Sequence, residues 1–438
     1  MKPSAEYTGL LSVTDPSEMG ERISTLLPEL GLATDPEWSL SVPRVLPRKS
    51  GEVLIQYRIS TPPSAARALA PTILFGVFHP EHRPFDTPTP ETCSGIVAIR
   101  DLRLHLWKFP SDPELHHLPT LLDGERFVET YGESLEAHSL PSTKPEQPLE
   151  TYGYRLGRRF VGRLRWDAAT PKFPNQTKEV LVKMCRPRQA LALWTRQRQL
   201  ENVGFHAKSE DSISLPHQYF VHGETGALFQ TFETGVALHE LTSDEQFITG
   251  CEAAARILEK LQRVKLTGLP RHSPHDEIEH LRWMCNATAA AFPESETDIR
   301  RHLGELLRRL PSTPAIGKTI ICHRDFYDKQ VLFDGTRSIL VDYDTLSEGD
   351  ASLDYGNFAA HLQWRAMQTP KAAGIIEAGL EAFDRRRRHA NPELTQRVEW
   401  WIAAALLRIA CLYLWRPRWS ELASELLSNS NSRACVTT

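Results

Sequence analysis

The chain has 438 residues, of which 41% are hydrophobic and 24% are charged, and its formal net charge is -4. This length allows two or three domains with a sizeable core, and the composition excludes a chain that is disordered throughout. The slightly negative charge also excludes a protein coated in positive charge, so we predict no nucleic-acid partner.

The sequence contains no clear signal for export, membrane insertion or disulfide bonding. The first 16 residues include one lysine and no apolar run of seven, so we expect no signal peptide. The most apolar stretch, Trp401–Trp415, is shorter than a bilayer requires and contains Arg408, which favours a buried helix. Seven widely spaced cysteines include no CxxC pair, so neither a zinc site nor a disulfide framework is expected. We therefore predict a cytoplasmic protein with no membrane partner.

Strand patterns occupy the first third of the chain. Between Val42 and Leu122, the runs GEVLIQYRI, PTILFGVF and SGIVAIRDLRLHLWKF are separated by segments rich in Pro, Ser and Thr. We expect residues 1–135 to form an N-terminal β-rich cap. The segment Glu133–Glu150 has prolines, charges and little periodic apolar content, so it is the best linker candidate.

A second strand group and a helical region follow this linker. The runs GYRLGRRFVGRLRWDA, KEVLVKMC and ALFQTFE predict strands, and Arg188–Glu201 predicts a helix, which together give a small lobe over residues 151–236. Residues 237–438 are predicted to form a large helical lobe, interrupted by one β segment at Thr319–Asp342. Its helices are expected at Phe247–Val264, Ile278–Ala291, Ile299–Leu310, Ala372–Arg388 and Leu394–Leu414.

The two strand groups share a spacing. Gly51 is followed 29 residues later by Pro80, and Gly157 is followed 30 residues later by Pro187. This spacing suggests an internal duplication, in which Lys183 aligns with Gly76 and the cap is a degenerate copy of the small lobe. A chance match of two unrelated hairpins explains the spacing equally well.

The segment Ile320–Leu362 contains the residues that point to chemistry. Apolar triplets alternate with charged residues, so His323–Gln330 is predicted to be a loop between strands and Asp342 to end a strand. Phosphoryl transfer needs a carboxylate that accepts the proton of the attacking hydroxyl, and oxygen ligands for metal ions. We predict Asp325 as the catalytic base, and Gln330 and Asp342 as the Mg²⁺ ligands.

This segment resembles the aminoglycoside phosphotransferase and choline kinase-like superfamily, whose signature is His-x-Asp, an Asn five residues later and an Asp that closes the next strand. His323, Asp325 and Asp342 match the signature, and LDYGNF at residues 353–358 resembles its Asp-Leu-Gly-Asn-Phe continuation. Gln330 stands where most members have Asn, and Arg324 stands where Gly is usual. The resemblance implies an α+β, two-lobed protein kinase-like fold that uses ATP and Mg²⁺.

The resemblance also implies a nucleotide site in the small lobe. Lys183 is a cation in an apolar strand, and it would hold the α- and β-phosphates of ATP and be oriented by Glu201 from the following helix. Gln230–Glu233 takes the place of the interlobe hinge, so Thr231 and Glu233 would lie beside the adenine. The sequence contains no GxGxxG or Walker loop.

Several alternatives remain open. The His-Arg-Asp triplet alone also fits a structural loop, and within the family His323 and Asp354 are predicted to brace that loop by hydrogen bonds. The acidic residues Asp276, Glu277 and Glu279 fit either a site for a cationic aminoglycoside or a solvated helix face.

We expect a kinase that phosphorylates a hydroxyl of a small molecule, such as a sugar, amino sugar, aminoglycoside or amino alcohol, and that is a monomer or homodimer. The alternatives are a non-catalytic sensor that binds nucleotide or metabolite, suggested by Gln330, and a protein kinase.

Overall fold

The computed structural model describes residues 3–26, 28–30, 38–60, 72–85, 96–112, 114–146, 149–167, 178–310 and 320–428. The chain divides into two compact units. The β-rich unit holds residues 5–197 and 217–233, and the helical unit holds residues 1–4, 198–216 and 234–438. Cys93 and Cys435 lie outside the described residues, and the other five cysteines are buried and free of disulfide bonds.

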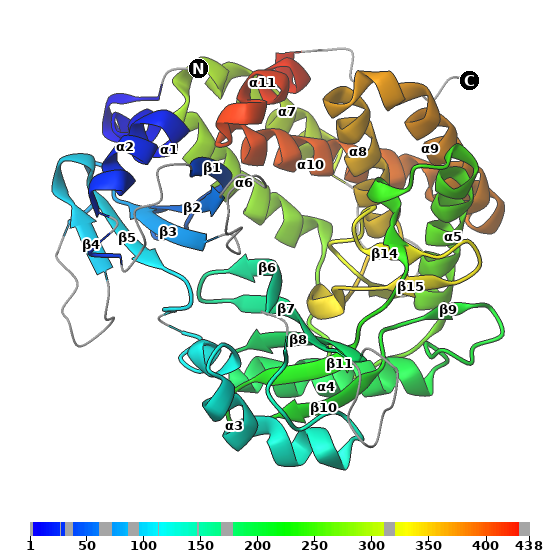
Figure 1. Ribbon diagram of the computed structural model, residues 1–438. Coiled ribbons are helices and arrows are strands. Elements are labelled where there is room, and N and C mark those ends of the chain that lie inside the picture. Colours follow the sequence, from blue (N-terminus) through cyan, green and yellow to red (C-terminus); the bar gives the residue numbers. More distant parts are fainter. Residues whose placement is uncertain are drawn as a thin grey trace. The chain divides into compact units, whose positions relative to one another are not determined.

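Two five-stranded antiparallel sheets form the framework of the β-rich unit (Figure 1). Strand β7 illustrates why these segments are strands, because its residues alternate between half-buried and buried positions. The strands are β1 (Ser39–Pro47), β2 (Val53–Ser60), β3 (Thr72–Phe78), β4 (Ile96–Ile99), β5 (Leu104–Lys108), β6 (Glu150–Arg155), β7 (Arg159–Trp166), β8 (Lys178–Cys185), β10 (Gln218–His222) and β11 (Ala227–Thr231). All the predicted strand groups are present, but the runs named as strands in the sequence include neither β1 nor β10.

The two sheets have the same strand order and the same register. The first sheet runs β1-β2-β3-β5-β4 and the second runs β6-β7-β8-β11-β10. Gly51 and Gly157 occupy the equivalent first turns, and both have positive φ angles, of 100° and 64°. In each sheet, one row of register partners crosses four neighbouring strands. The row consists of Ile55, Gly76, Leu106 and Val97 in the first sheet, and of Val161, Lys183, Leu228 and Val221 in the second.

This register places Gly76 at the position equivalent to Lys183, as the glycine and proline spacing suggested. A Cβ atom at Gly76 would lie only 2.8 Å from Leu104 Cδ1 and 3.0 Å from Tyr57 Cε2. No side chain therefore fits at this point of the first sheet without movement of its neighbours. The first sheet thus has neither the lysine nor the space for one.

The two sheets share one hydrophobic core. It joins Phe75 and Trp107 of the first sheet to Phe160 and Val182 of the second. Phe75 and Tyr154 meet edge to face, with ring centroids 4.7 Å apart. Helix α4 (Pro187–Asn202) contributes to a separate small core on the opposite face of the second sheet, with Cys185, Ala190, Leu193 and Leu228.

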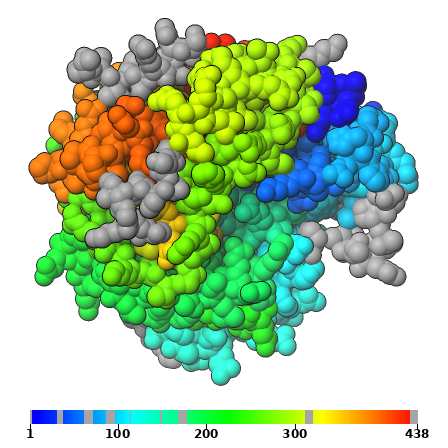
Figure 2. All heavy atoms as spheres, turned by 180° about the vertical axis from the view of Figure 1, so that it is seen from behind, coloured from blue at the N-terminus to red at the C-terminus, as the bar shows by residue number. Residues whose placement is uncertain are grey.

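The helical unit is built around α10 (Thr395–Leu414), which packs against α6, α7, α8 and α11, while α5 packs against α9 (Figure 1). Figure 2 shows α6 and α7, in yellow-green, as part of the outer surface of this unit. The remaining helices are α5 (Asp244–Arg263), α6 (Pro274–Ala291), α7 (Glu296–Arg308), α8 (Leu353–Gln368), α9 (Ala373–Ala390) and α11 (Ser420–Ser428). The five helices predicted for this region are confirmed, and Ser243 and Ser273 cap α5 and α6 at their first turns. None of the described helices is both long enough and apolar enough to cross a membrane.

Six short strands complete the helical unit. The pair β13 (Ile320–Cys322) and β16 (Ser347–Gly349) forms a two-stranded sheet. A four-stranded sheet has the order β12-β14-β15-β9, from β12 (Val236–Ala237), β14 (Val331–Phe333), β15 (Ser338–Leu340) and β9 (Ile213–Ser214). The predicted β segment at 319–342 is confirmed for residues 320–342, since residue 319 is outside the described part.

The predicted order of elements is present, and the α+β fold class with an N-terminal β-rich part is confirmed. The linker predicted at Glu133–Glu150 is wrong at its start, because Glu133 lies inside α3 (Gly124–Ala137), where Tyr131 and Leu135 face the core. The cap also carries two helices that were not predicted, α1 (Leu10–Thr14) and α2 (Pro16–Leu26). The domain limits at residues 135, 151 and 236 stay predictions.

Candidate active site

The loop that carries Asp325 is held at its start by a carboxylate from α8. Asp354, buried in the first turn of α8, accepts hydrogen bonds from the backbone N–H groups of His323 at 2.6 Å and Arg324 at 2.8 Å. A loop whose backbone N–H groups donate to a buried carboxylate is held more firmly than a loop whose N–H groups donate to water. The predicted bracing role of Asp354 is confirmed.

Three further contacts hold the loop in place. The hydroxyl of Thr345 donates to the carbonyl of His323 at 2.7 Å, and the side-chain amide of Asn357 donates to the carbonyl of Phe326 at 2.9 Å. The Nε2 atom of His323 lies 3.2 Å from the carbonyl oxygen of Val341. His323 is fully buried, so its predicted bracing role is also confirmed.

The same contacts bring the predicted metal ligands toward the loop. The backbone N–H of Val341 donates to the carbonyl of Gln330 at 2.9 Å, so the residue before Asp342 is tied to both Gln330 and His323. Asp342 has φ 58° and ψ 41°, a left-handed conformation that turns the chain away as β15 ends. The structure therefore brings the backbones of Asp325, Gln330 and Asp342 into one small region.

This region offers the oxygen ligands that magnesium prefers. No group of three or more His, Cys, Asp or Glu side chains within the described ranges gathers closely enough to hold a metal by itself. A magnesium ion that accompanies a nucleotide needs only one or two protein carboxylates, because phosphates and water complete its octahedron. Asp342 and the amide oxygen of Gln330 fit such a partial site.

The predicted nucleotide-binding residues lie mainly in the β-rich unit. Lys183 lies on β8 between the buried residues Val182 and Met184, on the face where Leu228 packs with α4. Thr231, at the end of β11, is tied to Glu233 through its hydroxyl, which also accepts a hydrogen bond from the backbone N–H of His217 at 2.9 Å.

Glu201 and the loop that carries Asp325 belong to the helical unit, whereas Lys183 belongs to the β-rich unit. Glu201 is the only acidic residue of α4, and it lies 3.5 Å from Arg198 on the same helix. The proposed pairing of Lys183 with Glu201, and the convergence of Lys183 with Asp325 on one nucleotide, therefore remain predictions.

A pocket lies in the helical unit, beside the loop His323–Gln330, which is called the catalytic loop below after its predicted base Asp325. Its polar lining consists of His272, Glu277, Arg324, Asn357, Trp401 and Arg408. Trp401 and Arg408 share one face of α10 because they are seven residues apart. Arg324 connects the pocket to the predicted base, which is the next residue in the chain.

The floor of this pocket is a network that sequence reasoning missed. Arg408 is 3.2 Å from Glu277 and also donates to Asn357, the residue that holds the catalytic loop through Phe326. The Nε2 atom of His272 lies 3.2 Å from the other oxygen of Glu277. The signal in the sequence was Arg408, the one charged residue in the apolar run Trp401–Trp415.

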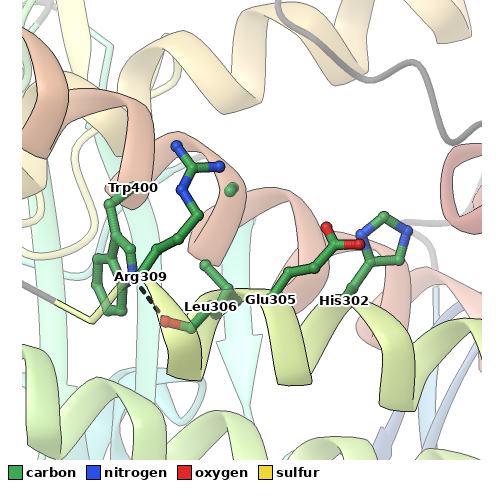
Figure 3. Close-up of a pocket in the computed structure, with 6 residues that line it drawn as sticks. His302, Glu305, Leu306, Arg309 and Trp400 are labelled. Carbon is green, nitrogen blue, oxygen red and sulfur yellow. Dashed lines mark hydrogen bonds between the residues drawn. The ribbon is translucent and has the colours of Figure 1, made fainter.

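A second pocket lies on the other face of α10, against α7 (Figure 3). His302 and Glu305 of α7, and Arg309 just after the helix, line it with Trp400, whose indole N–H donates to the carbonyl of Leu306 at 3.1 Å. None of its lining residues belongs to the catalytic loop. The pocket that contains Arg324 is therefore the one that adjoins the predicted base.

Comparison with known proteins gives one family match. Residues 215–391 match the model of the phosphotransferase enzyme family, a span that includes the catalytic loop, the β14–β15 hairpin and α8. Among proteins with curated descriptions, none matches the chain.

Solved structures of kinases are similar at a low level. A choline/ethanolamine kinase family protein from Mesorhizobium loti has 16% identity and a TM-score of 0.43, over 67% of this chain and 95% of its own. Choline kinase from Streptococcus pneumoniae has 12% identity and a TM-score of 0.42, over 69% and 98%. An aminoglycoside phosphotransferase from Streptomyces rimosus has 16% identity and a TM-score of 0.38, over 59% and 92%. The family match over residues 215–391 confirms that the chain resembles the aminoglycoside phosphotransferase and choline kinase-like superfamily.

Proposed function

We propose that this protein is a cytoplasmic phosphotransferase that uses ATP and Mg²⁺ to phosphorylate a hydroxyl group of a small molecule. One observation carries the proposal. Asp354 holds the start of the loop that carries Asp325, and Val341, the residue before Asp342, is tied to Gln330 and His323, all within the segment that matches the phosphotransferase family.

In the proposed reaction, Asp325 accepts the proton of the acceptor hydroxyl as its oxygen forms a bond to the γ-phosphorus of ATP. The bond from that phosphorus to the β–γ bridging oxygen breaks, and ADP leaves. Asp342 and Gln330 would hold Mg²⁺, which would neutralise the phosphate charge when bound. Lys183 binds the α- and β-phosphates and orients the triphosphate.

Removal of the metal tests the proposed cofactor. We expect purified protein to release ADP from ATP when it is given its acceptor, and we expect EDTA to abolish this release, because no charge of the protein replaces the cation on the phosphates. Added Mg²⁺ should restore the activity. ADP release that continues undiminished in EDTA would contradict the proposal.

The phosphate-binding role of Lys183 is tested by its replacement. Lys183→Met should raise the KM for ATP by about 10- to 100-fold, because a charge-assisted hydrogen bond contributes about 1.5–3 kcal/mol. Lys208→Met is the matched control, since Lys208 is an exposed lysine outside the proposed site. If both variants had the same KM for ATP, Lys183 would not be part of the nucleotide site.

A sensor without catalysis is the second candidate, because Gln330 is one methylene longer than the asparagine usual at this position. Calorimetry with ATP and Mg²⁺ separates the two functions. Binding of ATP without ADP release, across a library of hydroxyl compounds and amino sugars, would favour the sensor.

A further inference from the structure

The acidic residues that first suggested a cationic acceptor are all engaged by the protein. Glu277 is 4% exposed and is neutralised by Arg408, and Glu279 is 2.8 Å from Arg282. Asp276 accepts hydrogen bonds from the backbone N–H and the hydroxyl of Ser273, each at 2.7 Å, within the capping box of α6. Glu277 and Asp276 are therefore poor ligands for an incoming ammonium group, and the 70% exposed Glu279 does not line the pocket.

The pocket beside the catalytic loop has an excess of positive charge. Its lining includes two arginines, Arg324 and Arg408, and one carboxylate, Glu277, so one positive charge is in excess among these three side chains. Burial by itself raises the pKa of Glu277, but Arg408 and His272 lower it to about 2, so Glu277 is ionised and committed to Arg408. Arg324 is the cation that remains.

Arg324 and Trp401 also present unsatisfied donors. Across the described parts of the chain, the buried Nε of Arg324 and the buried indole N–H of Trp401 have no hydrogen-bond acceptor. Buried donors without acceptors are costly, and a ligand that supplies oxygen atoms removes the cost. Hydrogen bonds from Ser273 lower the pKa of Asp276, and the charge of Arg324 adds to this effect, but no ion pair joins these two residues.

The backbone of Arg324 is equally unusual. Its φ angle is 71°, a left-handed conformation that favours glycine, and the resemblance predicts glycine at this position. An arginine in this conformation costs stability relative to glycine, so its presence calls for a benefit elsewhere. A guanidinium group directed at the pocket next to the predicted base is such a benefit.

We infer that the acceptor is a hydroxyl compound that carries a carboxylate, and that Arg324 and the indole N–H of Trp401 bind this carboxylate while the hydroxyl faces Asp325. A single carboxylate matches the single excess charge of the pocket, and a guanidinium group matches the geometry of a carboxylate. This inference rests on the proposed function and narrows it from small-molecule hydroxyls in general to hydroxy acids.

Two matched series of compounds test the inference. D-glucuronate, D-glucose and D-glucosamine form one series, and glycerate, glycerol and 3-amino-1,2-propanediol form the other, so that charge varies on a constant scaffold. Two readouts are used: ADP release with ATP and Mg²⁺, and the shift in the thermal unfolding midpoint with each compound alone. We expect the carboxylate to give the largest response within at least one series.

A variant of Arg324 tests whether this residue causes the preference for the carboxylate compound. Arg324→Gly keeps the fold, since glycine favours the φ angle at this position, and it should lower kcat/KM for the carboxylate by about 10- to 100-fold while the neutral compound changes little. Arg271→Met is the matched control, because Arg271 is an exposed arginine outside the pocket. An unchanged preference in Arg324→Gly would overturn the inference.

The two readouts separate this inference from the proposed function. A carboxylate-dependent midpoint shift that is lost in Arg324→Gly, without ADP release, would support the binding site and contradict the kinase. ADP release that is greatest with the amino compounds would support the kinase and overturn the carboxylate. No response to either carboxylate in either assay would also overturn it.

Discussion

Replacement of Asp325 by asparagine is expected to lower kcat by about 10²- to 10⁴-fold, the usual contribution of a positioned general base. Asparagine has nearly the same shape as aspartate but cannot accept the proton of the acceptor hydroxyl. The backbone clamp on the loop comes from Asp354, so the loop should keep its course. The affinity for ATP, measured by calorimetry, should change little because Asp325 is proposed to act on the acceptor.

A suitable control is Asp298→Asn, which removes an aspartate of α7 that forms an ion pair with Arg301. This variant should keep the turnover of the unmodified protein. If Asp325→Asn lost less than about tenfold in kcat, Asp325 would not be the base. If it lost ATP binding to the same extent as turnover, the residue would hold the nucleotide instead.

The second large effect is expected for stability. Replacement of Glu277 by leucine should destabilise the helical unit by about 3–5 kcal/mol, because Arg408 would be left in a largely buried position without its charge partner. Urea unfolding followed by tryptophan fluorescence measures the change in midpoint. The double variant Glu277→Leu with Arg408→Leu should recover part of the loss, since it removes both charges.

The control is Glu279→Gln, two residues further along α6. Glu279 is 70% exposed and is paired only with Arg282, so its loss should leave the midpoint unchanged. A Glu277→Leu variant that behaved like Glu279→Gln would show that the pair contributes no stability.

The carboxyl group of Glu277 should also make the free energy of unfolding depend on pH. The ordinary pKa of Glu277 is 4.5, and Arg408 and His272, acting against burial, lower it to about 2 in the folded protein. A group with a lowered pKa in the folded state contributes its stability above the unfolded pKa, and this is lost as the pH falls toward the folded value. The stability difference between the unmodified protein and Glu277→Gln should therefore be constant from pH 7 to about pH 5 and shrink from about pH 4.5 to 2.

Much of the fold could be predicted from local pattern. The helix α10 follows from apolar residues at helical spacing, and β8 follows from KEVLVKMC, since one period dominates each segment. The loop at His323–Gln330 follows from the apolar triplets that flank it, which form β13 and β14. Helix α3 was missed because its sequence has many charges and a neighbouring proline-containing segment, while its buried face needs only Phe127, Tyr131 and Leu135.

The pairing of buried charges could not be predicted, because the partners come from distant segments. Asp328, in the loop predicted at His323–Gln330, is 1% exposed and forms an ion pair with Arg365 of α8, 37 residues away in the sequence.

The N-terminal part of the β-rich unit holds the first turn of the second sheet. Asp112, just after the first sheet, accepts hydrogen bonds from the hydroxyl of Tyr154 at 2.6 Å and from the backbone N–H of Gly157 at 2.8 Å. The turn between β6 and β7 is thus fastened by a residue of the N-terminal part of the chain, without a glycine-rich sequence. Loss of the N-terminal residues that include Asp112 would therefore loosen a turn more than forty residues away in the sequence.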